Sequence, residues 1–236
     1  MYGVQVTMSS PSIPPRPVGH RAGLSRDAVL RAARRIADDE GVDRLTMRRL
    51  SAEVGVMPNA IYTYFADKDA LLAGLLDHLL GEIETPDEAE RDWRGGLVEI
   101  MDSSRRLVLA HLQLATMFLT RQSVGPNAAR LGEITFRLLR QGGIEGERAV
   151  EAFRTILIYT LGFAAFQAPR QQSDATARTA RGLAAFSGLD PDQYPALRDV
   201  AKPLATHPTD DNFHTGLRWL LDGMSADTSE LQLKTR

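Results

Sequence analysis

Apolar side chains recur every three or four residues along most of the chain, which is the spacing of amphipathic α-helices. Between Leu45 and Leu72 this pattern predicts two short helices around Gly55 and then the start of a third. A helix-turn-helix has this form, and in such motifs the second helix enters the major groove of DNA. There is no alternating strand pattern and no internal repeat. The fold class is therefore predicted to be all-α.

Polar residues in front of the apolar runs mark the predicted helix starts in the first part of the chain. Ser25, Thr46 and Asp67 can each cap a helix with a side-chain oxygen, and Pro58 suits the first turn of another. The predicted helices cover residues 25–39, 46–54, 58–65 and 67–84.

The remainder of the chain also has helical periodicity, interrupted by Gly and Pro. Further helices are predicted over residues 89–110, 111–121, 127–141, 145–167 and 210–224, with a short one bracketed by Pro195 and Pro203. Residues 169–190 are polar and are predicted to form a mobile loop. The predicted organisation is a flexible arm (1–23), a three-helix helix-turn-helix domain (24–68), a second helical domain (69–224) joined through the helix at about 67–84, and a tail (225–236).

The composition is that of an ordinary globular protein, with 236 residues, 43% hydrophobic and 25% charged. The chain has no cysteine, which excludes disulfides and thiolate metal sites and is consistent with a reducing cytoplasm. No run of 18 or more apolar residues exists, and the first residues lack the features of a secretion signal. We therefore expect a cytoplasmic protein with no membrane span.

The sequence offers no constellation of catalytic residues. Its five histidines are scattered, and it has no cysteine nucleophile, no metal-ligand spacing and no glycine-rich phosphate loop. Gln141-Gly142-Gly143 is explained as a helix end. A turn followed by a helix start likewise explains His207 and His214. We predict no enzyme activity, no cofactor and no metal site.

Charge is distributed unevenly, although the net value of −2 does not by itself indicate a nucleic-acid binder. Residues 1–70 contain nine arginines and one lysine against eight acidic residues, a local net charge of +2, so the remainder carries −4. Arg16, His20, Arg21 and Arg26 lie just before the helix-turn-helix. Such an arm could reach phosphates or an adjacent minor groove; the alternative is a solvated tail.

The helix-turn-helix resembles the N-terminal domain of the tetracycline-repressor (TetR) family of bacterial transcription regulators. The similarity extends over about 60 residues, from Leu24 to Glu84. The marks that carry it are Leu45-Thr46, Ala52, Gly55-Val56, Ile61-Tyr62, Tyr64-Phe65, Lys68 and Leu71-Leu72.

The second half is similar to the ligand-binding domain of the same family, in FRLLRQGGI, AFRTILIYTLGFAAFQ and FHTGLRWLLDGM. The resemblance implies a homodimer in which the helices at about 145–167 and 210–224 of two subunits form a four-helix interface. Tetracycline repressors hold a drug-bound magnesium partly through a His and a Glu. The matching neighbourhoods here, Met117-Phe118 and Phe166, are apolar, which argues against a magnesium–tetracycline complex as the effector.

In a family-like docking, the helix that begins at Pro58 lies in the major groove and the helix that begins at Thr46 crosses its edge. Arg48 could read guanine through O6 and N7, or instead contact a phosphate or form a surface ion pair. Asn59 could pair with adenine or bond to its own backbone. The predicted DNA contacts are Thr46, Met47, Arg48, Pro58, Asn59, Ala60, Tyr62, Thr63, Tyr64 and Lys68.

Within this set, Pro58 and Ala60 could touch thymine methyl groups, and the hydroxyls of residues 62–64 and the charge of Lys68 could serve phosphates. One of the two tyrosines could instead belong to the core. Met57 stands where many members of the family have a Ser or Thr cap. Its thioether is a poor cap, so we expect the cap to come from water or from elsewhere.

A small effector is expected to bind in a mostly apolar cavity of the second domain with a few polar groups. For each lining residue taken alone, a place in the core is the alternative. The predicted effector contacts are His111, Gln113, Met117, Phe118, Phe136, Phe153, Tyr159, Phe163 and Gln167. The resemblance favours a repressor that the effector releases from a palindromic operator. An activator, or a helical DNA-binding or interaction protein that needs no ligand, is the alternative.

Overall fold

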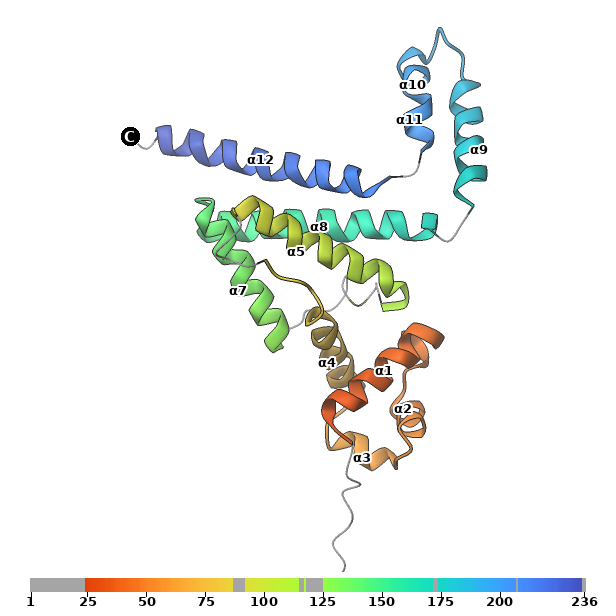
Figure 1. Cartoon of the computed structure of the whole chain (residues 1–236), viewed down its shortest axis with the longest axis vertical. Coiled ribbons are helices and arrows are strands. Elements are labelled where there is room, and N and C mark those ends of the chain that lie inside the picture. The colour runs from red at the N-terminus through yellow and green to blue at the C-terminus, as the bar shows by residue number, and fades with distance from the viewer. Residues whose placement is uncertain are drawn as a thin grey trace, which may run out of the picture.

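The computed structural model describes residues 24–86, 92–114, 117, 125–171, 174–206 and 208–234. Every regular element in these segments is helical, and no strand occurs in them, which confirms the predicted all-α class. Figure 1 shows a small bundle at one end and a layer of long helices at the other, joined by α4.

The small bundle contains three helices and a short 3-10 turn. They are α1 (Arg26–Glu40), η1 (Val42–Arg44), α2 (Met47–Glu53) and α3 (Pro58–Tyr62). The predicted caps are confirmed, because the side chains of Ser25 and Thr46 accept the N–H groups of Ala28 and Arg49. Helix α3 is shorter than predicted and ends before Phe65.

Helix α4 (Lys68–Leu80) connects the bundle to the rest of the molecule. Asp67 caps its start by accepting the N–H of Ala70 at 2.7 Å, as predicted. All its leucines except the partly buried Leu80 are buried, since the helix packs on both α1 and α7. It ends at Leu80 rather than Glu84.

Asp77 ties α4 to the start of α7 (Pro126–Gln141). Its buried carboxylate accepts the backbone N–H of Ala128 at 2.9 Å, and its carbonyl accepts the amide of Asn127 at 3.0 Å. A methyl group at Gly125 would overlap this carboxylate, so the close approach requires glycine there. A residue of α4 thus supplies the N-terminal cap that α7 lacks in its own sequence.

The second domain is built on α5 (Trp93–Ala110), α7, α8 (Gly146–Gln171) and α12 (Asp210–Lys234). Helix α5 packs along α8, and α12 runs beside α8 (Figure 1) and contacts both helices. Helix α12 continues to Lys234, beyond the predicted end at Met224. The helix predicted over 111–121 begins with η2 (Leu112–Leu114), and apart from Met117 its remaining residues lie outside the described part of the chain.

The prediction of a loop at 169–190 is wrong, because α9 (Ala175–Ser187) occupies most of this stretch. Asp174 caps this helix by accepting the N–H groups of Thr176 and Ala177, and its alanines favour the helical state. Two short helices come next, α10 (Pro195–Asp199) and α11 (Ala201–Ala205). Pro203 lies inside α11 rather than beside it, in the first turn, where its missing N–H is not needed.

Candidate DNA-binding surface and effector domain

The turn between α2 and α3 depends on one glycine. Gly55 has φ +69°, a left-handed conformation that side chains with a Cβ rarely adopt. The N–H of Val56 closes the turn by donating to the carbonyl of Ser51 at 3.0 Å. Leu50 and Ile61 are fully buried on the inner faces of α2 and α3. The turn and the shared core therefore fix the angle between the two helices and leave their other faces to solvent.

Two adjacent arginines on α2 have different surroundings. The guanidinium of Arg49 pairs with Glu40 at 2.6 Å and with Glu53 at 2.9 Å. These hydrogen bonds raise the pKa of Arg49. Arg48 is exposed, and its guanidinium has no ion pair or hydrogen bond to any described residue. Arg48 is therefore free to bind a ligand, whereas Arg49 is committed to holding α1 against α2.

The exposed start of α3 carries the remaining candidates for base contact. Met57 provides no side-chain cap, as predicted, and is 77% exposed. The amide of Asn59 is exposed and makes no hydrogen bond within the part of the chain that the structure describes. Pro58 and Ala60 are partly exposed beside it. The structure thus brings Arg48 and the start of α3 onto the solvent side of one motif.

The structure contradicts the predicted DNA contact at Met47. Its side chain is buried in the core formed by α1, α2 and α4. The periodicity explains the error: Met47 lies three residues before Leu50, so both side chains face inward on the same stripe of α2.

Two of the predicted hydroxyl contacts are already engaged inside the protein. The hydroxyl of Tyr64 donates to the carbonyl of Leu24 at 2.7 Å, and its ring packs on the core, so it is the core tyrosine of the predicted alternative. The hydroxyl of Thr63 donates to the carbonyl of Ala60 at 2.8 Å. Tyr62 is exposed, and no hydrogen bond of its hydroxyl is found among the described residues.

Three further polar residues at the edges of the helix-turn-helix are candidates for DNA contact. The Thr46 hydroxyl, although exposed, accepts the N–H of Arg49 at 3.0 Å and so acts as a helix cap. Lys68, at the start of α4, makes no ion pair with a described residue. Arg44 was not predicted; it ends η1, is exposed and is unpaired among the residues described. The sequence did not indicate a role for Arg44, because a single arginine between two helices is not part of a helical pattern.

In the second domain, His111 joins the two halves of the molecule rather than lining a cavity. Its buried ring bonds through Nδ1 to Asp38 at 2.9 Å and through Nε2 to the guanidinium of Arg34 at 2.8 Å. Because arginine only donates, Nε2 must accept and the proton lies on Nδ1. Arg34 also pairs with Glu82. This imidazole therefore links the end of α5 to α1.

Gln167 belongs to a buried polar cluster between α5, α8 and α12. Arg105, only 2% exposed, donates to Gln167 at 2.8 Å, to Asp102 at 2.9 Å and to Asp210 at 2.9 Å. Partial burial acts to raise the pKa of Asp210, but the hydrogen bond and charge of Arg105 outweigh it and lower that pKa below its ordinary value. The cluster fixes the start of α12 against α5.

The predicted aromatic contacts are divided between two places. Tyr159 and Phe163 pack against Phe213, and the Tyr159 hydroxyl donates to the Phe213 carbonyl at 3.0 Å, so they bind α12 to α8. Phe136 and Phe153 meet elsewhere, with ring centroids 5.4 Å apart between α7 and α8. Met117 is buried. Phe118 and the side chain of Gln113 lie outside the described residues.

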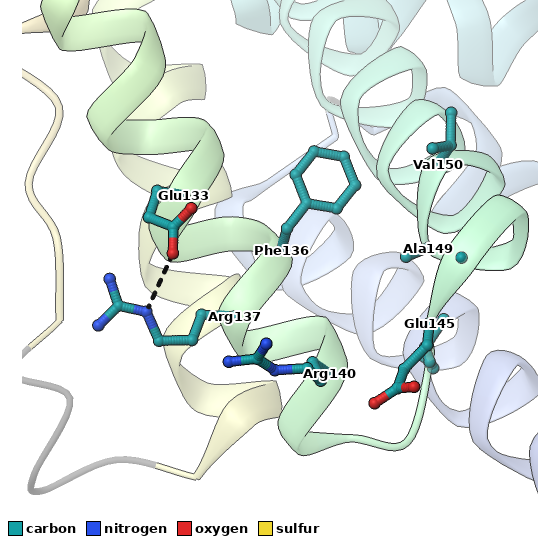
Figure 2. A pocket seen from close by; sticks show the side chains of 9 residues that line it. Glu133, Phe136, Arg137, Arg140, Glu145, Ala149 and Val150 are labelled. Atoms are coloured by element: carbon teal, nitrogen blue, oxygen red, sulfur yellow. Dashed lines mark ion pairs between the residues drawn. The ribbon is translucent and has the colours of Figure 1, made fainter.

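A cleft of about 400 Å³ opens between the end of α7 and the start of α8 (Figure 2). Phe136, Ile144, Ala149 and Val150 are its apolar lining residues. Charged residues complete the lining: Glu133, Arg137, Arg140 and Glu145. Of the predicted effector contacts whose side chains the structure describes, Phe136 alone lines this cleft.

Helices α8 and α12 each carry large apolar side chains that are exposed to solvent. Ile158 is 70% exposed, Trp219 74% and Phe166 51%. A groove of about 540 Å³ lies between the two helices beside Trp219, where Gly216 approaches the Tyr159 hydroxyl so closely that a Cβ would overlap it. The stretch Gly146–Ala168 of α8 has the length and composition of a membrane span, and 28% of it is buried within this chain.

Comparison with known proteins identifies both halves of the chain. Residues 29–75 match the family model described as bacterial regulatory proteins, tetR family. Residues 85–228 match the tetracyclin repressor-like C-terminal domain. The two matched regions together span most of the chain.

Individual relatives align over nearly the whole length. The chain is 31% identical to the HTH-type transcriptional repressor DrrR1 of Streptomyces coeruleorubidus, over 87% of this chain and 79% of the relative. It is 30% identical to the class A tetracycline repressor protein from transposon 1721 of Escherichia coli, over 86% and 91%. The solved structure of Streptomyces coelicolor ActR in complex with actinorhodin has a TM-score of 0.77 at 30% identity, covering 88% of this chain and 99% of that one. The chain therefore belongs to the tetR family of bacterial regulatory proteins, and it is a DNA-binding transcriptional regulator rather than an enzyme.

Proposed function

We propose that this regulator is a homodimeric cytoplasmic repressor that binds a pseudo-palindromic operator and is released by a small, largely apolar effector. The observation that carries the proposal is that the side chains of Arg48 and Asn59 are exposed and make no hydrogen bond or ion pair with a described residue. An exposed guanidinium and an exposed amide beside the start of α3 match the donor and acceptor patterns of guanine and adenine in the major groove. Repression is supported by the two relatives that are themselves named repressors.

A dimer is expected from the size of the motif. One helix-turn-helix reads only a few base pairs, and two related by a two-fold axis read half-sites one helical turn apart. The exposed apolar surface formed by Ile158, Phe166 and Trp219 is of the kind that two copies bury against each other. We infer a four-helix interface in which α8 and α12 of one subunit pack on the same helices of the other.

The effector is inferred from the α7–α8 cleft. Its volume of about 400 Å³ lies within the range of small-molecule sites, and its apolar residues are interspersed with charged ones. The structure of ActR with actinorhodin shows a relative that binds a small molecule. An effector that moves α7 would act on α4 through Asp77, and so on the spacing of the two recognition motifs.

The test is selection of duplex DNA from a random pool by the full-length protein, followed by affinity measurements on the selected site. The double variant Arg48→Ala/Asn59→Ala should lose roughly 30- to 25,000-fold in affinity with an unchanged Tm, since each good base contact is worth about 1–3 kcal/mol and two are removed. Arg31→Ala, on the α1 surface and paired with Asp27, is the matched control and should bind normally. Failure of the full-length protein to enrich any sequence contradicts the proposal. Transcription in vitro from the selected site then distinguishes repression from activation.

A further inference from the structure

The helix-turn-helix domain is attached to the second domain at two places. Helix α4 forms the first attachment, since it packs on both α1 and α7. The second attachment lies where η2 packs on α1. Leu114 of η2 is fully buried in the same core as Ile36 of α1, and its N–H donates to the carbonyl of His111 at 2.8 Å. A single attachment leaves a domain able to rotate about it, whereas two separate attachments fix its orientation.

Polar side chains complete the second attachment. The ring of His111, only 8% exposed, donates from Nδ1 to the Asp38 carboxylate at 2.9 Å and accepts from the Arg34 guanidinium at 2.8 Å. Arg34 also pairs with Glu82, in the turn that follows α4. These bonds therefore join α1 to the end of α4 and to the end of α5. A buried network whose members are all bonded holds them in one arrangement.

The bonds of Arg34 run between the domains rather than within one. Arg35, the next residue of α1, pairs with Glu53 of α2 inside the helix-turn-helix domain. Arg34 instead reaches His111 and Glu82, which both lie beyond that domain in the chain. The position of α5 is thus transmitted to α1 without passing through the leucine core of α4.

We propose that His111 is a positioning residue for operator recognition, which sets the half-site spacing that the dimer accepts. The inference rests on the proposed function, since it needs an operator read by two helix-turn-helix domains. Each base pair inserted between half-sites moves them about 3.4 Å apart and turns one by about 35° relative to the other, given about 10–10.5 base pairs per turn of about 34–36 Å. Domains held by His111 cannot follow such a change, whereas domains that rotate about α4 can.

The experiment measures affinity for duplexes built on the DNA that the full-length protein selects. They are the selected site, versions with one or two base pairs added or removed between the half-sites, and a duplex with one half-site. His111→Phe removes both hydrogen bonds of the ring. His111→Gln is the conservative variant, since its amide can still accept from Arg34 and donate to Asp38. Arg34→Leu breaks the contact from α1, and Arg35→Leu is the matched control, because this exposed side chain pairs within the helix-turn-helix domain.

The parent, His111→Gln and Arg35→Leu should lose about a hundredfold or more in affinity when the spacing changes by one base pair, because the two domains no longer engage together. His111→Phe and Arg34→Leu should lose less than about tenfold on the same change. Affinity for the single half-site should be equal in every protein. Each affinity is measured below the unfolding transition of the variant, so that a lower Tm does not affect the comparison.

A parent-like spacing preference in folded His111→Phe and Arg34→Leu would overturn the inference, as would a parent that tolerates the changed spacing. A loss of half-site affinity in these two variants would also overturn it, since His111 would then support the fold of the domain rather than its placement. If His111→Phe does not fold, Arg34→Leu decides, because it leaves the bond between His111 and Asp38 in place. If the full-length protein selects no DNA, the proposed function fails instead.

Discussion

The two ends of this molecule use their polar side chains in opposite ways. At the end that carries α2 and α3, Arg48 and Asn59 are exposed and Lys68 is partly exposed, and none of the three side chains has a partner in the described segments. In the second domain, Arg105 and His111 are buried and bonded to other helices. An unpaired exposed group is available to a ligand, whereas a paired buried group fixes the position of a helix. The same residue types therefore indicate a binding surface at one end and a framework at the other.

The largest loss of operator affinity is expected when the proposed dimer interface is disrupted. The double variant Ile158→Asp/Trp219→Asp puts charges into the exposed apolar surface of α8 and α12, so the protein should sediment as a monomer. A monomer reads one half-site, and operator affinity should fall more than about a hundredfold although α3 is untouched. Glu151→Gln, an exposed change on α8, is the control. If the variant remains dimeric, α8 and α12 do not form the dimer interface.

The next test concerns the buried framework itself. Arg105→Met leaves Asp102 and Gln167 without their main partner and should lower the free energy of unfolding by about 3–5 kcal/mol. Arg106→Met removes the guanidinium of a 55%-exposed side chain that pairs with Glu84 and with the other oxygen of Asp102, and should cost about 1 kcal/mol or less. Below the unfolding transition, operator affinity should be unchanged. Equal stability of the two variants would show that the cluster does not hold the domain together.

Two adjacent residues of α2 provide a sharper contrast. Met47→Ala empties a core position and should destabilise the protein by about 2–3 kcal/mol without altering base preference. Arg48→Ala should leave Tm unchanged and cost about 1–3 kcal/mol of operator binding, with relaxed preference at one base pair. Denaturant unfolding and binding titrations separate the two. If Met47→Ala changed specificity in a fully folded protein, the assignment of its side chain to the core would be wrong.

The smallest expected effect is the pH dependence of the polar cluster. Since Arg105 lowers the pKa of Asp210, the carboxylate contributes stability above its ordinary pKa of 3.8, and this is lost as pH falls below about 4. His214 and Asp102 face the same cluster. Asp210→Asn should therefore be less stable at about pH 7 and should lose less stability on acidification. Asp211→Asn, also in the first turn of α12, should match the parent curve.

The recognition end was predictable because its determinants are local. The caps at Ser25, Thr46 and Asp67, the turn at Gly55 and the proline at position 58 all act within a few residues, and each lies where the sequence predicts it. Local reasoning could not decide the direction of individual side chains. The rotation of α2 buries Met47, and the contact between Leu24 and Tyr64 joins residues forty positions apart.

The effector end was less predictable, because its contacts join helices far apart in sequence. The periodicity located α5, α7, α8 and α12, but no spacing shows that Gln167 meets Arg105 or that His111 meets Asp38. An aromatic residue at helical spacing is equally compatible with a cavity wall and with helix packing. Phe136 takes the first role and Phe163 the second. Helix α9 was missed because its polar residues, together with Gly182 and Ser187, favour a loop when they are considered locally.

The contact at Asp77 couples a movement of α7 to a movement of α4. The sixteen residues of α7 form a stiff rod about 24 Å long, given a rise of about 1.5 Å per residue. Its first turn is pinned to α4 by Asp77, and its last turns form one wall of the cleft. Gly125 lies so close to the Asp77 carboxylate that the two helices have little room to shift at this contact. A molecule that moves the far end of α7 away from α8 would therefore also move α4, the helix that connects to α2 and α3.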